Sequence, residues 1–418
     1  MGQKLIPIAK PYFGEEEATA AREAILSGWV TQGPRVEKFE ENFADYVGAK
    51  YACAVSSCTT ALHLALLSIG VGSGDVVITV SHSFIATANS VRHCGAEPVF
   101  VDIDPDTFNM SPLGLEKFLL KECVVRGGRL HYRKASGLAK GESPLVRRNI
   151  KKGNAIGGVA AIMPVHQMGM PCDMKAILSL AGRFKVPVVE DAACAIGSEI
   201  SLDAEKHWER IGRPHGDIAC FSFHPRKVIA TGDGGMLVTN SATHDKRFRL
   251  LRQHGMSISD TARHVSSTVV FEKYMETGYN YRMTDIQAAV GIEQLKRMRE
   301  IIKDRKRVAA QYKEALGAIS WLKLPEEPFY CRTNWQSYPV RVLKSAPCRR
   351  DALMQYLLDR GVSTRRGIMN AHQERPYRNS HFDLKNSEIA RDSVMLLPIF
   401  YDLDEADIKK IAKVIRSA

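Results

Sequence analysis

The chain has 418 residues, of which 45% are hydrophobic and 25% are charged. This composition is ordinary for a globular protein, and the chain is too long for one small core. No apolar run is long enough to cross a membrane and the first residues do not resemble a signal peptide, so we expect a cytoplasmic protein. The nine cysteines form no Cys-x-x-Cys pair, which argues against a zinc site and favours a reducing compartment.

The net charge of +12 is concentrated in one segment. Residues 121–152 contain ten Lys or Arg and two Glu, so this segment carries eight of the twelve net positive charges. Glycines are interspersed, and we expect a surface excursion over about 121–157 and not a core element. A solvated loop, a clamp for substrate phosphates in a partner subunit, and a surface for anionic partners or nucleic acid all stay open.

Strands and helices alternate through the first half of the chain. After helices at 15–27 and 34–47, the patterns predict strands at 51–55, 76–80, 98–102, 159–164 and 186–190, with helices at 61–69, 85–93, 113–120 and 174–184 between them. Two further apolar strands follow at 218–221 and 236–239. This alternation predicts a mostly parallel sheet with helices on both faces, whose ligands bind at the carboxyl ends of the strands.

The second half of the chain has a different predicted pattern of helices and strands. Helices are expected to dominate residues 241–316, and a shorter mixed region follows with strands at 338–342 and 362–366 and helices at 350–360 and from 404 onward. We therefore expect a large α/β domain over 1–300 and a small α/β domain over 301–418.

Residues suited to ligand binding follow several of these strands. Cys58 and Thr59 lie in a strand–turn–helix arrangement that suits phosphate binding as well as it suits an ordinary helix cap. Phe84 and His166 come just after strands, and Asp191 ends the buried strand 186–190. A carboxylate there can pair with a pyridinium nitrogen, although capping a helix is the commoner use of an Asp.

The segment 221–235 has the strongest chemical signal. A buried strand leads to Ser222 and then to Lys227, and a glycine turn leads into a second buried strand. A Lys between two buried strands is costly unless it has a partner or a task. Forming a Schiff base with a carbonyl compound, as in pyridoxal-phosphate enzymes, is such a task.

These motifs occur in the order found in one family. The sequence resembles the pyridoxal-phosphate-dependent nucleotide-sugar aminotransferases of the DegT/StrS type, which have the fold-type-I aminotransferase architecture. The matching segments are Ile6–Pro11, Gly28–Pro34, Ser57–Leu62, Glu190–Ala193, Phe221–Lys227, Gly278–Asp285 and Ile286–Ala289. The resemblance implies pyridoxal 5'-phosphate as cofactor and transfer of an amino group, from L-glutamate, to a keto-sugar nucleotide.

The resemblance also implies roles for individual residues. Lys227 would bind the cofactor covalently and move protons, and Asp191 would hold the pyridine nitrogen. The other cofactor contacts would come from Cys58, Thr59, Phe84, Cys194, Ser222 and, across a homodimer interface, Asn280. Contacts to the sugar nucleotide would come from Trp29, Thr31, His166 and the loop that runs from Arg365 and Arg366 to His372.

Three features depart from the family pattern. Position 194 is Cys where Gln is most common, position 58 is Cys where Gly is commoner, and the basic insertion replaces a short connection. Three alternatives stay open: a sugar dehydratase, a cyclitol aminotransferase, and a nucleic-acid-binding protein on an inactive scaffold. Lys227 argues against the first, because such dehydratases carry His there, and the intact set of site residues argues against the last.

Overall fold

The computed structural model describes residues 5–146, 156–258, 269, 271–378 and 382–418. Among these residues, the strands of the larger sheet follow the order β1, β11, β10, β7, β6, β2, β3, with isolated bridges joining β7 to the end of β6. The strands are β1 Tyr51–Val55, β2 Asp75–Val80, β3 Glu97–Val101, β6 Gly158–Ile162, β7 Val189–Asp191, β10 Ile218–Ser222 and β11 Gly235–Thr239. Only β11 runs antiparallel to its neighbours in this set, so the expected mostly parallel sheet is confirmed.

Side chains that alternate along the strands enter two different cores. In β11, Met236 and Val238 join the cluster built on Phe39 and Phe43, while Leu237 joins the cluster on the other face. The helices of this part are α1 Glu15–Leu26, α2 Pro34–Val47, α3 Cys58–Ser68, α4 Ala86–His93, α5 Pro112–Glu122, α8 Met174–Phe184, α9 Ala242–Leu251 and α11 Asp285–Lys296. The sheet is therefore covered on both faces, and its polar ends are left for ligands.

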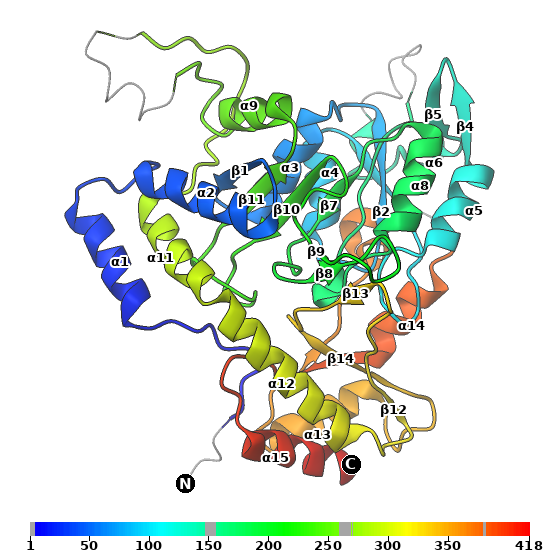
Figure 1. Cartoon of the computed structure of the whole chain (residues 1–418). Helices are drawn as coiled ribbons and strands as arrows, with labels where there is room; N and C mark the ends of the chain where they lie inside the picture. The colour runs from blue at the N-terminus through cyan, green and yellow to red at the C-terminus, as the bar shows by residue number, and fades with distance from the viewer. Residues whose placement is uncertain (1–4, 147–155, 259–268, 270, 379–381) are drawn as a thin grey trace.

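A smaller sheet lies beside α12 Met298–Leu316, at the lower end of the view in Figure 1. It is antiparallel, in the order β12, β14, β16, β15. Its elements are β12 Leu322–Lys323, β14 Tyr338–Val342, β15 Arg365–Arg366, β16 Val394–Leu397, α13 Arg350–Asp359, α14 Lys385–Ser393 and α15 Glu405–Arg416. Along α12, Ile301 belongs to the larger core and Val308 to the smaller one, which supports the boundary that we propose near residue 300.

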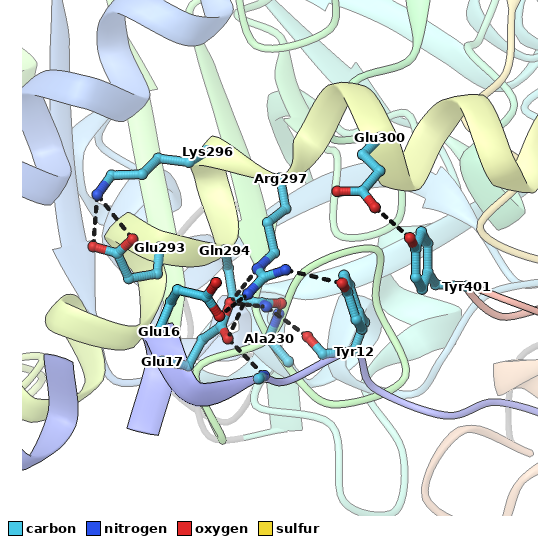
Figure 2. Close-up of polar contacts among 11 residues, drawn as sticks. Tyr12, Glu16, Glu17, Ala230, Glu293, Gln294, Lys296, Arg297, Glu300 and Tyr401 are labelled. Atoms are coloured by element: carbon cyan, nitrogen blue, oxygen red, sulfur yellow. Dashed lines mark hydrogen bonds and ion pairs between the residues drawn. The ribbon is translucent and has the colours of Figure 1, made fainter. Parts of the chain in front are cut away.

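The amino-terminal segment connects the two parts. Ile6 pairs with Val362 and is buried in the smaller core, although it precedes the elements of the larger sheet. Further along, Arg297 donates from Nε to Glu17 Oε1 at 2.8 Å and from Nη1 to the Tyr12 hydroxyl at 2.9 Å (Figure 2). These bonds tie α1 to the junction between α11 and α12.

The basic insertion differs from the prediction, because part of it is built into the sheet. β4 Cys123–Arg126 and β5 Arg129–Tyr132 form a hairpin that extends the sheet from β6, at the upper right of Figure 1, and the short helix α6 Ala135–Leu138 follows. Leu130, Leu138 and Leu145 are buried in the larger core, so the expectation of a surface excursion alone was wrong. Residues 147–155 of the insertion lie outside the described residues.

The segment between α9 and α11 also differs from the helical expectation. Its described residues form turns and bridges, among them Gln253 with Asn280 and Met256 with Tyr274. The close packing of two backbones explains this, because a Cβ on Gly255 would lie 2.0 Å from the carbonyl oxygen of Glu276. Among the helices that the structure describes, none is both long and apolar enough to span a membrane.

Candidate active site

A cavity of about 700 Å³ lies between the carboxyl ends of the larger sheet and the smaller sheet. Nine of the thirteen sequence-predicted site residues line it, and four do not. The nine are Cys58, Thr59, Phe84, His166, Asp191, Cys194, Ser222, Lys227 and Arg366. Residues from α3, β7, β10 and β15, and from the loops that follow the strands, thus converge on one cavity, as expected at the carboxyl ends of parallel strands.

The amino terminus of α3 forms one wall of the cavity. Cys58 and Thr59 occupy its first turn, where an α-helix supplies no acceptor for backbone N–H groups, and Ser57 caps the helix by accepting from the Thr60 amide at 3.2 Å. β11 passes close behind this turn, because a Cβ on Gly235 would lie 2.4 Å from the Ser57 carbonyl oxygen. This N-terminus, with its positive dipole end, suits the phosphate group of pyridoxal phosphate.

Asp191 is buried at the end of β7. Its Oδ2 accepts from the Thr87 hydroxyl at 2.8 Å and its Oδ1 from the Ala193 amide at 3.2 Å. Burial raises the pKa of this carboxyl, and the described residues place no Lys, Arg or His in an ion pair with it. A buried carboxylate that lacks a cation fits a protonated ring nitrogen, which is what the cofactor presents.

Lys227 lies in the turn after β10 and points its amine at a thiol. Nζ is 3.0 Å from Cys194 Sγ. Burial lowers the pKa of Lys227, but the adjacent Cys194, together with Cys58 and Asp191, outweighs burial and raises it above its ordinary value. The turn is anchored by the bond from the Ala230 amide to Gln294 Oε1, at 3.2 Å (Figure 2). An anchored amine in this position can bond to the carbonyl group of the cofactor.

Phe84 and Ser222 complete the predicted cofactor set within this chain. Phe84 precedes α4 and is 64% exposed although it lines the cavity, so its ring is available for a flat ligand to stack on it. Ser222 ends β10 and is 8% exposed, and its hydroxyl accepts a long bond from the His224 amide at 3.4 Å. The residues present therefore fit pyridoxal phosphate at its ring, its ring nitrogen, its phosphate and its carbonyl carbon.

His166 is held by the protein through both ring nitrogens. Nδ1 accepts from the Cys172 amide at 2.9 Å, so the proton sits on Nε2, which donates to Glu190 Oε2 at 3.0 Å. The Glu190 carboxylate also accepts from the backbone amides of His215 and Gly216, at 3.0 and 2.7 Å. The contact that His166 offers to the cavity is consequently ring surface and not a free nitrogen.

The predicted residues outside the cavity form two groups. His372 is bound to Ser81 and Glu388, at 2.7 and 3.2 Å. Trp29 and Thr31 belong to a loop that is tied to the segment containing Asn280, because the Asp285 amide donates to the Thr31 carbonyl at 2.9 Å and the Asp285 carboxylate accepts from the Gly33 amide at 2.8 Å. Asn280 itself is exposed.

Several residues of the site were not predicted. Thr87 supports Asp191 from α4, and the hydroxyl of Ser83, which precedes this helix, lies 2.7 Å from that of Thr87. Arg226 also lines the cavity, next to Arg365 and Arg366, which were expected near the sugar nucleotide. The position of Thr87 near a strand end could have indicated it, whereas nothing in the sequence around Arg226 marks it as a site residue.

Comparisons with known proteins identify the family of the chain. The DegT/DnrJ/EryC1/StrS aminotransferase family model matches residues 11–123 and 144–416, and leaves most of the hairpin β4–β5 unmatched. The chain is 33% identical to the spore coat polysaccharide biosynthesis protein SpsC of Bacillus subtilis, over 98% of this chain and 96% of that protein.

Solved structures give the same result. The aminotransferase TlmJ from Streptoalloteichus hindustanus superposes with a TM-score of 0.80 at 29% identity, covering 99% of this chain and 98% of that chain. DesV of S. venezuelae, solved with a ketimine intermediate, gives a TM-score of 0.80 at 27% identity with the same coverage. The chain therefore belongs to the DegT/DnrJ/EryC1/StrS aminotransferase family and is a pyridoxal-phosphate-dependent aminotransferase.

Proposed function

We propose that this enzyme transfers the amino group of L-glutamate to a keto-sugar nucleotide, in the cytoplasm and as a homodimer with shared active sites. The observation that carries the proposal is the cavity, in which an amine, a buried carboxylate and a helix N-terminus face one hollow of about 700 Å³. That volume is in the upper part of the range of small-molecule sites, which leaves space for a substrate beside a cofactor. All nine cysteines are free, which supports a reducing compartment.

The charges at the cavity favour an anionic substrate. Arg226, Arg365 and Arg366 line it, and all three side chains are exposed. Burial and the nearby Arg365 lower the pKa of Arg226, so two cations lie close together. A diphosphate or a dicarboxylate would relieve this repulsion through bidentate hydrogen bonds. Both proposed substrates, a sugar nucleotide and glutamate, carry such groups.

The residues of the chain then have distinct tasks. Pyridoxal phosphate, when bound, supplies the electron sink that stabilises a carbanion. Asp191 keeps the proton on the ring nitrogen, Phe84 orients the ring, and the first turn of α3 with Ser222 holds the phosphate. Lys227 Nζ would hold the proton that is moved between a carbon of the substrate and a carbon of the cofactor. The match to SpsC, named for polysaccharide biosynthesis, supports an amino sugar as the product.

The proposed reaction is tested first by trapping the cofactor on the protein and then by measuring turnover of candidate substrates. Borohydride reduction and peptide mapping should place a pyridoxyl adduct on Lys227, and glutamate should change the visible absorption of the purified protein. A panel of keto-sugar nucleotides then identifies the acceptor. A pyridoxyl adduct on another Lys would contradict the proposed cofactor site. If the enzyme aminated only cyclitol ketones, the acceptor would be a cyclitol and not a sugar nucleotide.

The shared site can be tested by subunit complementation. Asn280 does not line the cavity of its own chain, and its segment packs against the Ser56 amide beside the phosphate turn. We expect Lys227→Ala and Asn280→Ala each to lose most activity, and mixed dimers to regain one intact site. Each such dimer combines Lys227 of one subunit with Asn280 of the other. A mixture no more active than its components, with hybrids shown to form, would contradict a shared site.

A further inference from the structure

The turn after β10 that carries Lys227 is bonded to other parts of the chain by side-chain amides on two sides. Gln336 Nε2 donates to the Arg226 carbonyl at 2.8 Å, and Gln294 Oε1 accepts from the Ala230 amide at 3.2 Å. Gln336 lines the cavity, whereas Gln294 is 1% exposed and does not line it. Gln294 therefore affects the reaction only through the protein.

The neighbours of Gln294 fix which end of its amide faces the turn. The Ala230 amide is a donor and requires the oxygen, whereas the Tyr12 carbonyl and the Glu17 carboxylate are acceptors and require the nitrogen. Nε2 donates to the Tyr12 carbonyl at 2.6 Å and to Glu17 Oε1 at 2.9 Å (Figure 2). The amide thus uses both of its donors and its oxygen, and it cannot turn over without losing all three bonds.

Glu17 is held in the form that this orientation requires. Its side chain is buried, and Oε1 also accepts from Arg297 Nε at 2.8 Å while Oε2 accepts from the Gly14 amide at 2.7 Å. Burial raises the pKa of Glu17, but the bonds from Gln294, Gly14 and Arg297 outweigh burial and lower the pKa below its ordinary 4.5. Glu17 is consequently a carboxylate at neutral pH and keeps the nitrogen of Gln294 toward itself.

The bond to Gln294 lies where the turn is not closely packed. A small cavity of about 10 Å³, close to the volume that one water requires, is lined by Lys227, Ala230 and Gln294. The hydrogen bond therefore fixes the backbone of Ala230 at this point. Ala230 follows Lys227 by three residues in the same turn, so a shift of its backbone moves the lysine. Through the Tyr12 carbonyl, the same amide ties the turn to the amino-terminal segment.

We propose that Gln294 is a positioning residue for Lys227, because its amide holds the turn where Nζ is directed at the carbonyl carbon of the cofactor. This inference rests on the proposed assignment of Lys227 as the residue that bonds to pyridoxal phosphate. In that bond the amine nitrogen joins the carbonyl carbon, the carbonyl oxygen leaves as water, and no other reactant is needed. Bond formation requires aligned atoms, so a displacement of about 1 Å can lower its rate about 10²-fold.

The first test uses the full chain without cofactor and does not depend on what Lys227 binds. Hydrogen exchange of the Ala230 amide is measured by mass spectrometry in the wild type and in Gln294→Met, which keeps the length of the side chain and removes its amide. We expect exchange at Ala230 to be about tenfold faster or more in this variant. Equal exchange would overturn the proposal.

Glu293→Gln is the matched control for this test. Glu293 is the preceding residue of α11, and its carboxylate bonds to Lys296 at 2.7 Å (Figure 2). Exchange at Ala230 should be the same in this variant as in the wild type. A change as large as in Gln294→Met would mean that α11 as a whole supports the turn and would overturn the role of the amide.

The second test measures how fast Lys227 bonds to added pyridoxal phosphate. Borohydride is added at intervals, and the pyridoxyl adduct on Lys227 is quantified by peptide mapping at increasing cofactor concentrations. In Gln294→Met the rate at saturation should fall about 10–10²-fold. The half-saturating concentration should not change, because the first turn of α3, which we expect to hold the phosphate, is intact. An unchanged rate, or loss of folded protein alone in thermal unfolding, would overturn the positioning role.

Gln294→Glu tests the orientation of the amide and serves if Gln294→Met does not fold. Its carboxylate can still accept from Ala230, but it turns an oxygen toward the Glu17 carboxylate, so bonding of Lys227 should again be slower. Adding Glu17→Gln removes the repulsion between the two carboxylates and should restore part of the rate. A double variant no faster than Gln294→Glu would overturn the orientation.

The positioning role and the proposed cofactor site fail separately. A wild-type adduct on another Lys would overturn the cofactor site, whatever the exchange at Ala230 shows. An adduct on Lys227 that forms equally fast in the wild type and in Gln294→Met would leave the cofactor site standing and overturn the role of Gln294.

Discussion

Asp191 is a buried carboxylate that accepts hydrogen bonds from Thr87 and Ala193, and among the described residues no Lys, Arg or His forms an ion pair with it. Asparagine preserves its shape and removes its charge. We expect Asp191→Asn to keep the fold and to bind pyridoxal phosphate, with kcat lower by about 10²–10³-fold or more, as for other lost electrostatic partners. Absorbance of the bound cofactor and single-turnover rates measure the two effects. Near-normal turnover would mean that another group holds the ring nitrogen.

Thr87 allows a test of how the Asp191 carboxylate is supported, because the Thr87 hydroxyl donates to Asp191 Oδ2 at 2.8 Å. A hydrogen bond to a charged group contributes about 1.5–3 kcal/mol. Thr87→Val, which keeps the shape of the side chain, should lower kcat by about tenfold or more, and Thr87→Ser should restore most of it. Equal activity of the two variants in steady-state assays would exclude this role for the hydroxyl.

The hairpin β4–β5 is the element that the family model leaves largely unmatched, yet it contributes to the core. Leu130 is 3% exposed, and its cross-strand partner Val125 is 59% exposed. We expect Leu130→Ala to lower the free energy of unfolding by about 2–5 kcal/mol, because a buried cavity is created. Val125→Ala is the matched control and should have little effect in the same denaturant titration. Equal effects would mean that the hairpin is not anchored through Leu130.

Some basic side chains of the insertion are neutralised by carboxylates of the same chain. Arg129 pairs with Asp75 and Lys134 with Glu122, both at 2.8 Å. The hairpin joins β6 at its amino end, and the cavity lies at the carboxyl ends of the strands. A clamp on the substrate of the same subunit is therefore disfavoured by topology, and action on a partner subunit or on another anionic surface stays a prediction.

At the scale of the whole molecule, a buried ion cluster joins α2, β1 and α9. Glu40 pairs with Arg249 at 2.7 Å and with Arg252, and accepts from the Ala54 amide at 2.8 Å. Burial raises the pKa of Glu40, but the two arginines outweigh it and lower the pKa below its ordinary 4.5. A carboxylate with a depressed pKa stabilises the fold fully above its unfolded-state pKa and loses this effect as pH falls through the folded value.

Glu40→Gln should therefore destabilise the protein most at neutral pH, by about 3–5 kcal/mol, because it leaves buried arginines without their partner. The difference from the wild type should shrink as the pH falls below 4.5, because the unfolded chain then takes up a proton at Glu40 whereas the folded protein does so only at a lower pH. Glu41→Gln is the matched control, since that side chain is 57% exposed and pairs with the exposed Lys38. Denaturant unfolding at several pH values gives both curves, and a difference that does not vary with pH would contradict the account.

Much of this architecture follows from local pattern. Apolar alternation and helical spacing predicted α1, α2, α8 and the strands β1, β2, β3, β10, β11 and β14 to within a residue or two, because each of these elements buries one clear face. Lys227 and Asp191 were recognised for a related reason, since charged residues at the ends of buried strands are costly without a function. The family resemblance added the roles, and the comparisons confirm the family.

Contacts between residues that are distant in sequence could not be predicted from local patterns and depend on the tertiary structure. The hairpin of the insertion looked like a polar loop, because its buried residues are few and widely spaced, and only pairing with β6 makes Leu130 a core residue. The separation of Asn280 from the cavity, the use of both His166 nitrogens by Cys172 and Glu190, and the contact between Cys194 and Lys227 all join residues distant in sequence. Sequence determines which groups are present and which strands carry them, whereas the distance between groups on different strands depends on how the sheets pack.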